Sequence, residues 1–342
     1  MKIDDNIVHM AKIVFFDTEK WEDDYIKNAL SGLDAVVTSE KLDEASISKY
    51  QDVEIISCFI YSKLTKDILE KLPNLKFIAT RSMGYDHIDL TYCKAKGIKV
   101  ANVPAYGAHT VAEHTFALIL AISRKIVPSV EQARRGDFSS EGLEGFDLSG
   151  KTLGVIGTGN IGANVCEIGL SFGMHILAFN RSQNPELIAK GVKYVTLDEL
   201  LAGSDIITLH LPHVKETEHI INRTNLEKIK KGAVLINTAR GALVETQAIA
   251  EGLEKGILSG AGLDVLEEEA HLREEKEFLS EEYLKTVDIK TELLNHVLLT
   301  RDDVIITPHN AFNSKEAVEE IMETSVANVK AFVDNAPINI VE

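Results

Sequence analysis

Short apolar runs alternate with stretches of helical periodicity through the first third of the chain. Strands are predicted at residues 12–17, 53–60, 75–80 and 98–104, each followed by polar turn residues. Between the second and third runs, residues 64–72 place apolar side chains at helical spacing and stop before a proline. Because strands that are buried on both faces are continuously apolar, this pattern predicts a parallel sheet covered by helices.

A second series of strand and helix patterns begins near residue 147. Its predicted strands are residues 151–157, 175–180, 193–197, 205–212, 233–239, 260–265 and 303–309. Each is followed by a helical pattern or a loop, which indicates a second open parallel sheet. Between the two series, residues 108–125 predict a helix that is apolar on nearly all sides. Such a helix is expected in a core or at a subunit interface.

The last amphipathic pattern, residues 314–335, follows the final strand of the second series. Its apolar face needs a partner, and the first sheet is the natural candidate. The sequence therefore predicts an α/β chain in which one domain is discontinuous, with residues 1–106 and 308–342. The second domain, residues 107–307, is inserted into it. Two domains also fit a length of 342 residues at ~150 residues per domain.

The composition indicates which kinds of molecule the protein is unsuited to bind. The chain has 36 Lys and Arg residues against 53 Asp and Glu residues, a formal net charge of −17. An acidic surface repels phosphate backbones, so we expect neither nucleic acid nor an anionic membrane as a partner. The N-terminus lacks the apolar core of a signal peptide, and no apolar stretch approaches the ~20 residues of a membrane span. Cys58, Cys93 and Cys166 are far apart and lack metal-type spacing, so we expect a cytoplasmic protein with neither disulfides nor a metal site.

Residues 267–292 form a strongly acidic stretch, EEEAHLREEKEFLSEEYLKTVDIKTE. Its composition predicts a solvated, partly helical surface insertion.

A glycine-rich loop follows the predicted strand at 151–157 and opens a helical pattern. It consists of Gly157, Thr158, Gly159, Asn160, Ile161 and Gly162. The first glycine permits a tight turn, the second lets the backbone approach a pyrophosphate, and the third lets the helix pack close to the strand. The helix N-terminus adds N–H groups and a partial positive charge. The loop therefore predicts a dinucleotide site.

The next strand departs from the usual pattern of such sites. An acidic residue is expected ~20 residues after the loop, where it binds the adenosine ribose hydroxyls. Here the strand ends in Asn180, Arg181 and Ser182. Asn180 can bind a hydroxyl, and Arg181 either pairs with a 2′-phosphate or is simply exposed to solvent. The cofactor is therefore expected to be NAD(H), with NADP(H) also plausible.

Polar residues end three further strands. Arg240 follows the strand at 233–239, Asp264 and three glutamates end the strand at 260–265, and His309 follows Pro308. A guanidinium at the carboxyl edge of a parallel sheet can hold a carboxylate through two hydrogen bonds. An arginine, an acid and a histidine at one edge form a plausible catalytic cluster, although a single histidine is more often structural.

Seven segments carry a resemblance to a known family: RSMGYDHIDL, NVPAYGAHTVAEHTFALIL, GVIGTGNIG, HLPHVKET, NTARGALV, GLDVLEEE and TPHNAF. Over essentially its full length the chain resembles the D-isomer-specific 2-hydroxyacid dehydrogenases, and within them the D-lactate dehydrogenases. The resemblance implies a Rossmann-type NAD(P)-binding domain inserted into a flavodoxin-like substrate domain, and a homodimer. We expect the dimer contact at the apolar helix around residues 114–122. The alternative is that this helix lies inside one subunit.

The resemblance also implies roles for individual residues. The catalytic set is Arg240, Glu269 and His309, because the family places its acid five residues after the strand-end Asp264. Glu267 and Glu268 are then expected to be solvated surface carboxylates. Substrate contacts are implied for the backbone N–H groups of Met83 and Gly84 and for the side chains of Phe59, Tyr106 and Phe312. Further cofactor contacts are implied for His210, Pro212, Thr238 and Asp264.

The implied reaction is hydride transfer between a nicotinamide cofactor and a 2-keto acid, with pyruvate and D-lactate as the expected pair. Glyoxylate, hydroxypyruvate and bulkier 2-keto acids remain open as substrates. A dinucleotide-responsive binding protein without enzymatic activity is the alternative from another class, because the family includes transcriptional corepressors.

Overall fold

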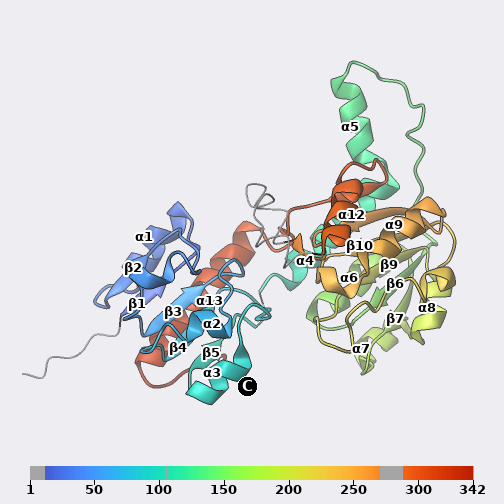
Figure 1. Ribbon diagram of the computed structural model, residues 1–342. Helices are drawn as coiled ribbons and strands as arrows, with labels where there is room; N and C mark the ends of the chain where they lie inside the picture. The colour runs from blue at the N-terminus through green and yellow to red at the C-terminus, as the bar shows by residue number, and fades with distance from the viewer. Residues whose placement is uncertain (1–11, 105, 270–287, 342) are drawn as a thin grey trace, which may run out of the picture. The chain divides into compact units, whose positions relative to one another are not determined.

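The computed structural model describes residues 12–104, 106–269 and 288–341. The chain divides into two compact units, shown in Figure 1. Unit 1 is Met1–Tyr106 with Ser314–Glu342, and unit 2 is Gly107–Asn313. The return to unit 1 falls after Asn313 rather than after residue 307. The reason is that the backbone N–H groups of Asn310 and Ala311 are hydrogen-bonded to Asp264 of unit 2.

Unit 1 is built on a parallel sheet with the strand order β2-β1-β3-β4-β5 among its described residues. The strands are β1 Ile13–Phe15, β2 Ala35–Val37, β3 Ile55–Cys58, β4 Phe77–Thr80 and β5 Lys99–Ala101. The helices are α1 Lys20–Ala29, α2 Lys66–Leu69, α3 Leu90–Lys96 and α13 Lys315–Val333. The apolar pattern predicts four of these strands. It misses β2, a short edge strand whose side chains are only partly buried.

Helix α13 closes one face of this sheet, as its amphipathic pattern predicts. Met322, Val326 and Val329 are buried in one core cluster with residues of β1, β3 and β4. Phe332 stacks on Phe77 of β4 with ring centroids 4.3 Å apart. The C-terminal segment of the chain thus completes the core of the unit that contains its N-terminal strands.

Unit 2 is built on a longer parallel sheet, with the described order β12-β11-β10-β9-β6-β7-β8. The strands are β6 Thr152–Ile156, β7 His175–Phe179, β8 Lys193–Tyr194, β9 Ile206–Leu209, β10 Ala233–Asn237, β11 Leu258–Leu263 and β12 Val304–Ile306. The helices are α4 Ala108–Ser123, α5 Ile126–Arg134, α6 Asn160–Ser171, α7 Pro185–Ala189, α8 Leu197–Gly203, α9 Thr246–Glu254 and α12 Ile289–Leu299. The α/β prediction of two parallel sheets is therefore confirmed.

The order of strands in unit 2 reverses at β6. The chain runs outward from β6 through β7 to β8, then returns to β9 on the other side of β6 and continues to β12. In open parallel sheets, ligands bind outside the carboxyl ends of the strands at such a switch point. The loop 157–162 follows β6 directly and therefore lies at this point.

Helix α4 packs one face against the sheet of unit 2. Phe116, Ile119 and Ile122 are buried in a core cluster of unit 2, whereas Glu113 and Ala117 are exposed. The helix ends at Ser123, and α5 starts after a left-handed residue at position 125. The expected core position is therefore confirmed for one face of the helix, and a subunit interface at its outer face remains a prediction.

Only the ends of the acidic stretch fall within the described residues, since 270–287 lie outside them. At these ends the prediction of a solvated surface is confirmed for Glu268, Asp288 and Lys290, which are exposed, and is wrong for two glutamates. Glu292 is 6% exposed on α12, and the side chain of Glu267 is 14% exposed. Within the part of the chain that the structure describes, no helix has both the length and the apolarity to cross a membrane.

Candidate active site

Three neighbouring strands of unit 2 bring the predicted catalytic residues to one sheet edge. Arg240 follows β10, Glu269 follows β11 and His309 follows β12, and these strands pair in parallel. Their carboxyl ends therefore lie side by side. Arg240 is half-buried, and its guanidinium donates to the carbonyl oxygen of Ala239 at 2.7 Å, while Asn237 Nδ2 donates to the Arg240 carbonyl at 2.8 Å.

His309 and Glu269 form a close pair. His309 Nδ1 lies 2.5 Å from Glu269 Oε1, and the two side chains are 19% and 31% exposed. A carboxylate on Nδ1 favours the tautomer with the proton at that nitrogen and stabilises the imidazolium. The pairing leaves Nε2 as the ring nitrogen that can exchange a proton with a substrate.

The structure separates the three consecutive glutamates. Glu268 is exposed and has a left-handed backbone with φ of 56°, so the chain turns sharply between its neighbours. Glu269 reaches His309, whereas Glu267 Oε1 lies 2.5 Å from His219 Nε2. The expectation that Glu267 is a solvated surface carboxylate is therefore wrong, because residues from other loops surround it.

Asp264 holds the loop that carries His309. Its carboxylate is 1% exposed and accepts hydrogen bonds from Thr307 Oγ1 at 2.5 Å, Asn310 N at 3.0 Å and Ala311 N at 2.9 Å. His114 Nε2 lies 3.1 Å from Thr307 Oγ1 and 3.6 Å from Asp264 Oδ1. The expected contact of Asp264 with the nicotinamide remains a prediction, and its observed contacts fix the backbone beside His309.

The glycine loop after β6 has the shape that a dinucleotide requires. Gly157 has φ of 96°, and a Cβ there would meet His210 O at 2.5 Å. A Cβ on Gly162 would meet Gly157 O at 1.9 Å, whereas a Cβ on Gly159 would point into open space. The first and third glycines are thus required by close packing. The second leaves room beside the N-terminus of α6 for a phosphate, so these residues fit an NAD-type cofactor.

His210 lies beside this loop in a desolvated setting. Its Nε2 lies 2.9 Å from Thr208 Oγ1, while its Nδ1 is buried without a hydrogen-bond partner among the described residues. Part of the residue is exposed, but burial of the ring lowers the pKa of His210 to about 3. The ring is therefore neutral at neutral pH.

The residues after β7 are partly engaged with one another. Asn180 Nδ2 donates to Ser182 O at 2.8 Å, and both Arg181 and Ser182 are exposed. Thr158 Oγ1 lies 2.9 Å from Tyr194 OH, which also accepts from Asn184 N at 3.0 Å. Tyr194 thus joins the glycine loop to the segment after β7. Sequence reasoning misses this residue, because only the pairing of β8 with β7 brings it there.

The other expected cofactor residues are also in unit 2. Pro212 is exposed, and Thr238 is buried with its Oγ1 2.9 Å from Thr115 Oγ1 on α4. Phe312 is half-buried in the same unit.

The remaining expected substrate residues lie in unit 1. Phe59 and Tyr106 are buried, while Met83 and Gly84 are half-buried on the loop after β4. Asp17 Oδ2 accepts from Phe59 N at 3.0 Å and from Ser62 Oγ at 2.8 Å. Burial raises the pKa of Asp17 despite these hydrogen bonds.

Arg81 supports the same region of unit 1. It is 2% exposed and donates to the carbonyl oxygens of Phe16 and Asp17, both at 2.8 Å. Asp17 and Arg81 thus tie the ends of β1, β3 and β4 together. Sequence reasoning does not identify either residue, because their contacts are made across the sheet.

Comparison with known proteins agrees with this geometry. The family model of the D-isomer specific 2-hydroxyacid dehydrogenase NAD-binding domain matches residues 116–311. A crystal structure of D-lactate dehydrogenase from Aquifex aeolicus, complexed with NAD and lactic acid, is similar with a TM-score of 0.89 and 40% identity, covering 96% of this chain and 99% of that chain. The D-lactate dehydrogenase of Escherichia coli is 33% identical over 93% of this chain and 95% of its own length. The hydroxypyruvate reductase of Thermotoga maritima is 38% identical over 83% of this chain and 87% of its own length. The chain therefore belongs to the D-isomer specific 2-hydroxyacid dehydrogenase family, and its unit 2 contains the Rossmann-type NAD-binding domain of that family.

Proposed function

We propose that this protein interconverts pyruvate and D-lactate with NAD(H) as cofactor. The observation that supports this most strongly is the 2.5 Å pairing of His309 with Glu269, at the sheet edge where Arg240 follows the neighbouring strand. Such a set contains a proton donor, a group that orients it and a cation for a carboxylate. The similarity to a D-lactate dehydrogenase complexed with NAD and lactic acid adds support.

In the direction of reduction, protonated His309 donates a proton from Nε2 to the oxygen that becomes the hydroxyl group. Glu269 holds the ring by Nδ1 and stabilises the imidazolium before transfer. Arg240 binds the substrate carboxylate and polarises the keto group. The reduced cofactor supplies the hydride when it is bound. One hydride and one proton convert the keto acid into the hydroxy acid, and in the reverse direction neutral His309 accepts the hydroxyl proton.

Unit 1 is proposed as the substrate domain. The backbone N–H groups of Met83 and Gly84 bind the substrate carboxylate in this proposal, and Phe59, Tyr106 and Phe312 limit the size of the side chain. In unit 2, the loop 157–162 and the N-terminus of α6 bind the pyrophosphate. Backbone donors suit a carboxylate because they are fixed by the fold before the substrate arrives.

A panel of 2-keto acids tests the substrate. Pyruvate, glyoxylate, hydroxypyruvate and a branched 2-keto acid are compared by kcat/KM with NADH, beside the His309→Gln variant as a blank. The proposal expects pyruvate to give the highest kcat/KM. A higher value with hydroxypyruvate or glyoxylate would replace pyruvate as the substrate. No turnover of any 2-keto acid would contradict the proposed activity.

We also propose a homodimer formed through the outer face of α4 and the segment after it. This segment exposes Ile126, Val127 and Val130 on α5, at 49%, 41% and 43%, and Phe138 at 87%. Apolar side chains gathered on one outward segment are typical of an interface. Light scattering at micromolar concentration should give the mass of two chains, and the mass of one chain would contradict the proposal.

A further inference from the structure

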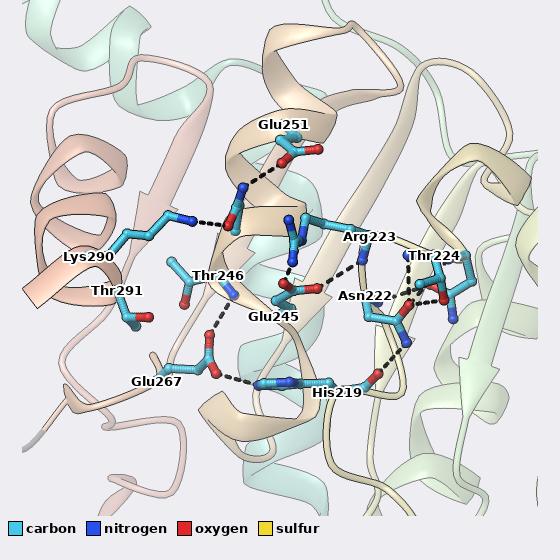
Figure 2. A network of polar contacts seen from close by, with 12 residues as sticks. His219, Asn222, Arg223, Thr224, Glu245, Thr246, Glu251, Glu267, Lys290 and Thr291 are labelled. Atoms are coloured by element: carbon cyan, nitrogen blue, oxygen red, sulfur yellow. Dashed lines mark hydrogen bonds and ion pairs between the residues drawn. The ribbon is translucent and has the colours of Figure 1, made fainter. Parts of the chain in front are cut away.

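Glu267 is a second carboxylate close to the proposed site, and it is bound from three directions. Its Oε1 lies 2.5 Å from His219 Nε2, and its Oε2 accepts the backbone N–H of Thr246 at 2.5 Å. Its carbonyl oxygen accepts from Asn295 Nδ2 on α12 at 2.8 Å. Figure 2 shows Glu267 between His219 and Thr246. A carboxylate that is 14% exposed needs such partners, because an unpaired buried charge is costly.

His219 belongs to a segment that runs beside the residues after Arg240. His219 N donates to Ala242 O at 2.8 Å, and the next contacts along are Ile221 N to Leu243 O at 3.2 Å and Glu245 N to Ile221 O at 2.9 Å. Asn222 Nδ2 donates to His219 O at 2.7 Å and holds the turn closed. His219 is hydrogen-bonded to the residues that follow Arg240. Its contact with Glu267 therefore links those residues to the segment that leads to Glu269.

These two segments also touch directly. A Cβ on Gly241 would lie 2.1 Å from the carbonyl carbon and oxygen of Leu266, so the backbones after β10 and β11 are in contact there. Leu266 N in turn donates to Glu269 Oε2 at 3.3 Å. A shift of Glu267 would therefore move the residues next to both Arg240 and Glu269.

Charged side chains of both signs lie around Glu267 and His219. Glu245 lies at the N-cap of α9 and is paired with Arg223 at 2.7 Å; burial opposes ionisation, but the hydrogen bonds and charge of Arg223 outweigh it and lower the pKa of Glu245. From α12, Lys290 binds Gln247, which donates to Glu251 at 2.7 Å. The N-terminus of α9 adds the positive end of its dipole to Glu267.

We propose that Glu267 and His219 are positioning residues of the active site. By binding His219 and the N-terminus of α9, Glu267 fixes the turn at Glu268 so that Glu269 faces His309. Neither residue touches the substrate. The proposal rests on the proposed function, in which the pairing of His309 with Glu269 carries the proton transfer.

The test compares Glu267→Gln with Glu268→Gln, a matched change at the adjacent exposed carboxylate. Activity is measured as kcat and KM for the keto acid, and NADH affinity by fluorescence. A displacement of about 1 Å at a catalytic group can cost ~100-fold in rate, so we expect kcat of Glu267→Gln to fall at least ~10-fold. The NADH affinity should change less than twofold, and Glu268→Gln should behave as the wild-type protein. Equal kcat values for the two variants would overturn the proposal.

A double variant separates positioning from loss of stability. If Glu267 acts through Glu269, then Glu267→Gln should lower kcat little further in a Glu269→Gln protein. A full additional loss would show that Glu267 acts independently of Glu269. His219→Gln, on a side chain that is 39% exposed, provides a milder disruption should Glu267→Gln fail to fold. It should lower kcat in the same direction, and unchanged kinetics there would also count against the pair.

A readout without turnover distinguishes this proposal from the proposed function. In histidine-labelled protein, the NMR signals of the two ring nitrogens of His309, assigned with His309→Gln, are compared at one pH. Glu267→Gln should change these signals in the same direction as Glu269→Gln, and Glu268→Gln should not. Unaffected His309 signals would overturn the positioning proposal. Absence of turnover in the wild-type protein would instead contradict the proposed function.

Discussion

Asp264 Oδ1 accepts a 2.5 Å hydrogen bond from Thr307 Oγ1, across the paired ends of β11 and β12. Together with the N–H groups of Asn310 and Ala311, this contact surrounds His309 with fixed backbone. His309 itself has φ of 53°, a conformation that non-glycine residues rarely adopt. The loop is therefore held in place by Asp264 rather than by its own backbone preference.

Asp264→Asn should loosen this loop. The amide offers one acceptor oxygen and places an NH₂ group where Asp264 now accepts N–H groups. Leaving a buried donor unsatisfied costs about 1–3 kcal/mol, so urea unfolding should show a loss of that size. Asp302→Asn, at an exposed carboxylate of the same unit, is the control and should be neutral. Equal stability of the two variants would argue against a structural role for Asp264.

Arg240→Lys keeps the positive charge but loses the planar guanidinium that can bind a carboxylate through two hydrogen bonds. We expect KM for the keto acid to rise strongly and kcat to fall, with NADH affinity nearly unchanged. Steady-state kinetics and NADH titration measure the two effects separately. If only NADH affinity fell, Arg240 would belong to the cofactor site.

The cofactor preference should be relaxed. Asn180 lacks the negative charge that would repel a 2′-phosphate, and the exposed Arg181 could pair with one. We expect kcat/KM with NADPH to lie within ~100-fold of the value with NADH, equivalent to about 2.8 kcal/mol. Asn180→Asp should raise the preference for NADH. A wild-type preference for NADH beyond ~10⁴-fold would show that Arg181 does not reach the ribose.

The buried ring of His210 should make the protein less stable in acid. Its pKa is about 3 in the folded protein against 6.5 for an ordinary histidine. Between these values the unfolded chain binds more protons, so this residue's contribution to the free energy of unfolding falls as pH drops from about 6.5 towards 3. His210→Gln should reduce that slope in urea titrations at several pH values, and His175→Gln, at an exposed histidine, should not. If the free energy of unfolding had the same pH dependence in both variants, the lowered pKa of His210 would be contradicted.

The sequence could predict the residues that stand at strand ends. Arg240, Asp264, His309 and the glycine loop follow continuous apolar runs, so their common edge follows from the strand pattern alone. The edge strand β2 escapes this reasoning because it is short and half-exposed.

The distinction among the three glutamates could not be worked out from the pattern of residues. Glu267, Glu268 and Glu269 are chemically identical, and only the left-handed turn at Glu268 directs Glu267 and Glu269 to different partners. Those partners, His219 and His309, come from loops far apart in the chain. Local periodicity holds no information on such contacts, so family resemblance alone indicated Glu269.

The most direct test of the account is keto-acid reduction by His309→Gln and Glu269→Gln. Loss of the proton donor should lower kcat by ~100-fold or more, the usual scale of general acid catalysis, while NADH affinity is retained. Glu269→Gln should also lower kcat but keep more of the activity, because the imidazole remains and loses only the carboxylate that orients it. Near wild-type turnover in His309→Gln, or an unchanged kcat in Glu269→Gln, would contradict the proposed pair.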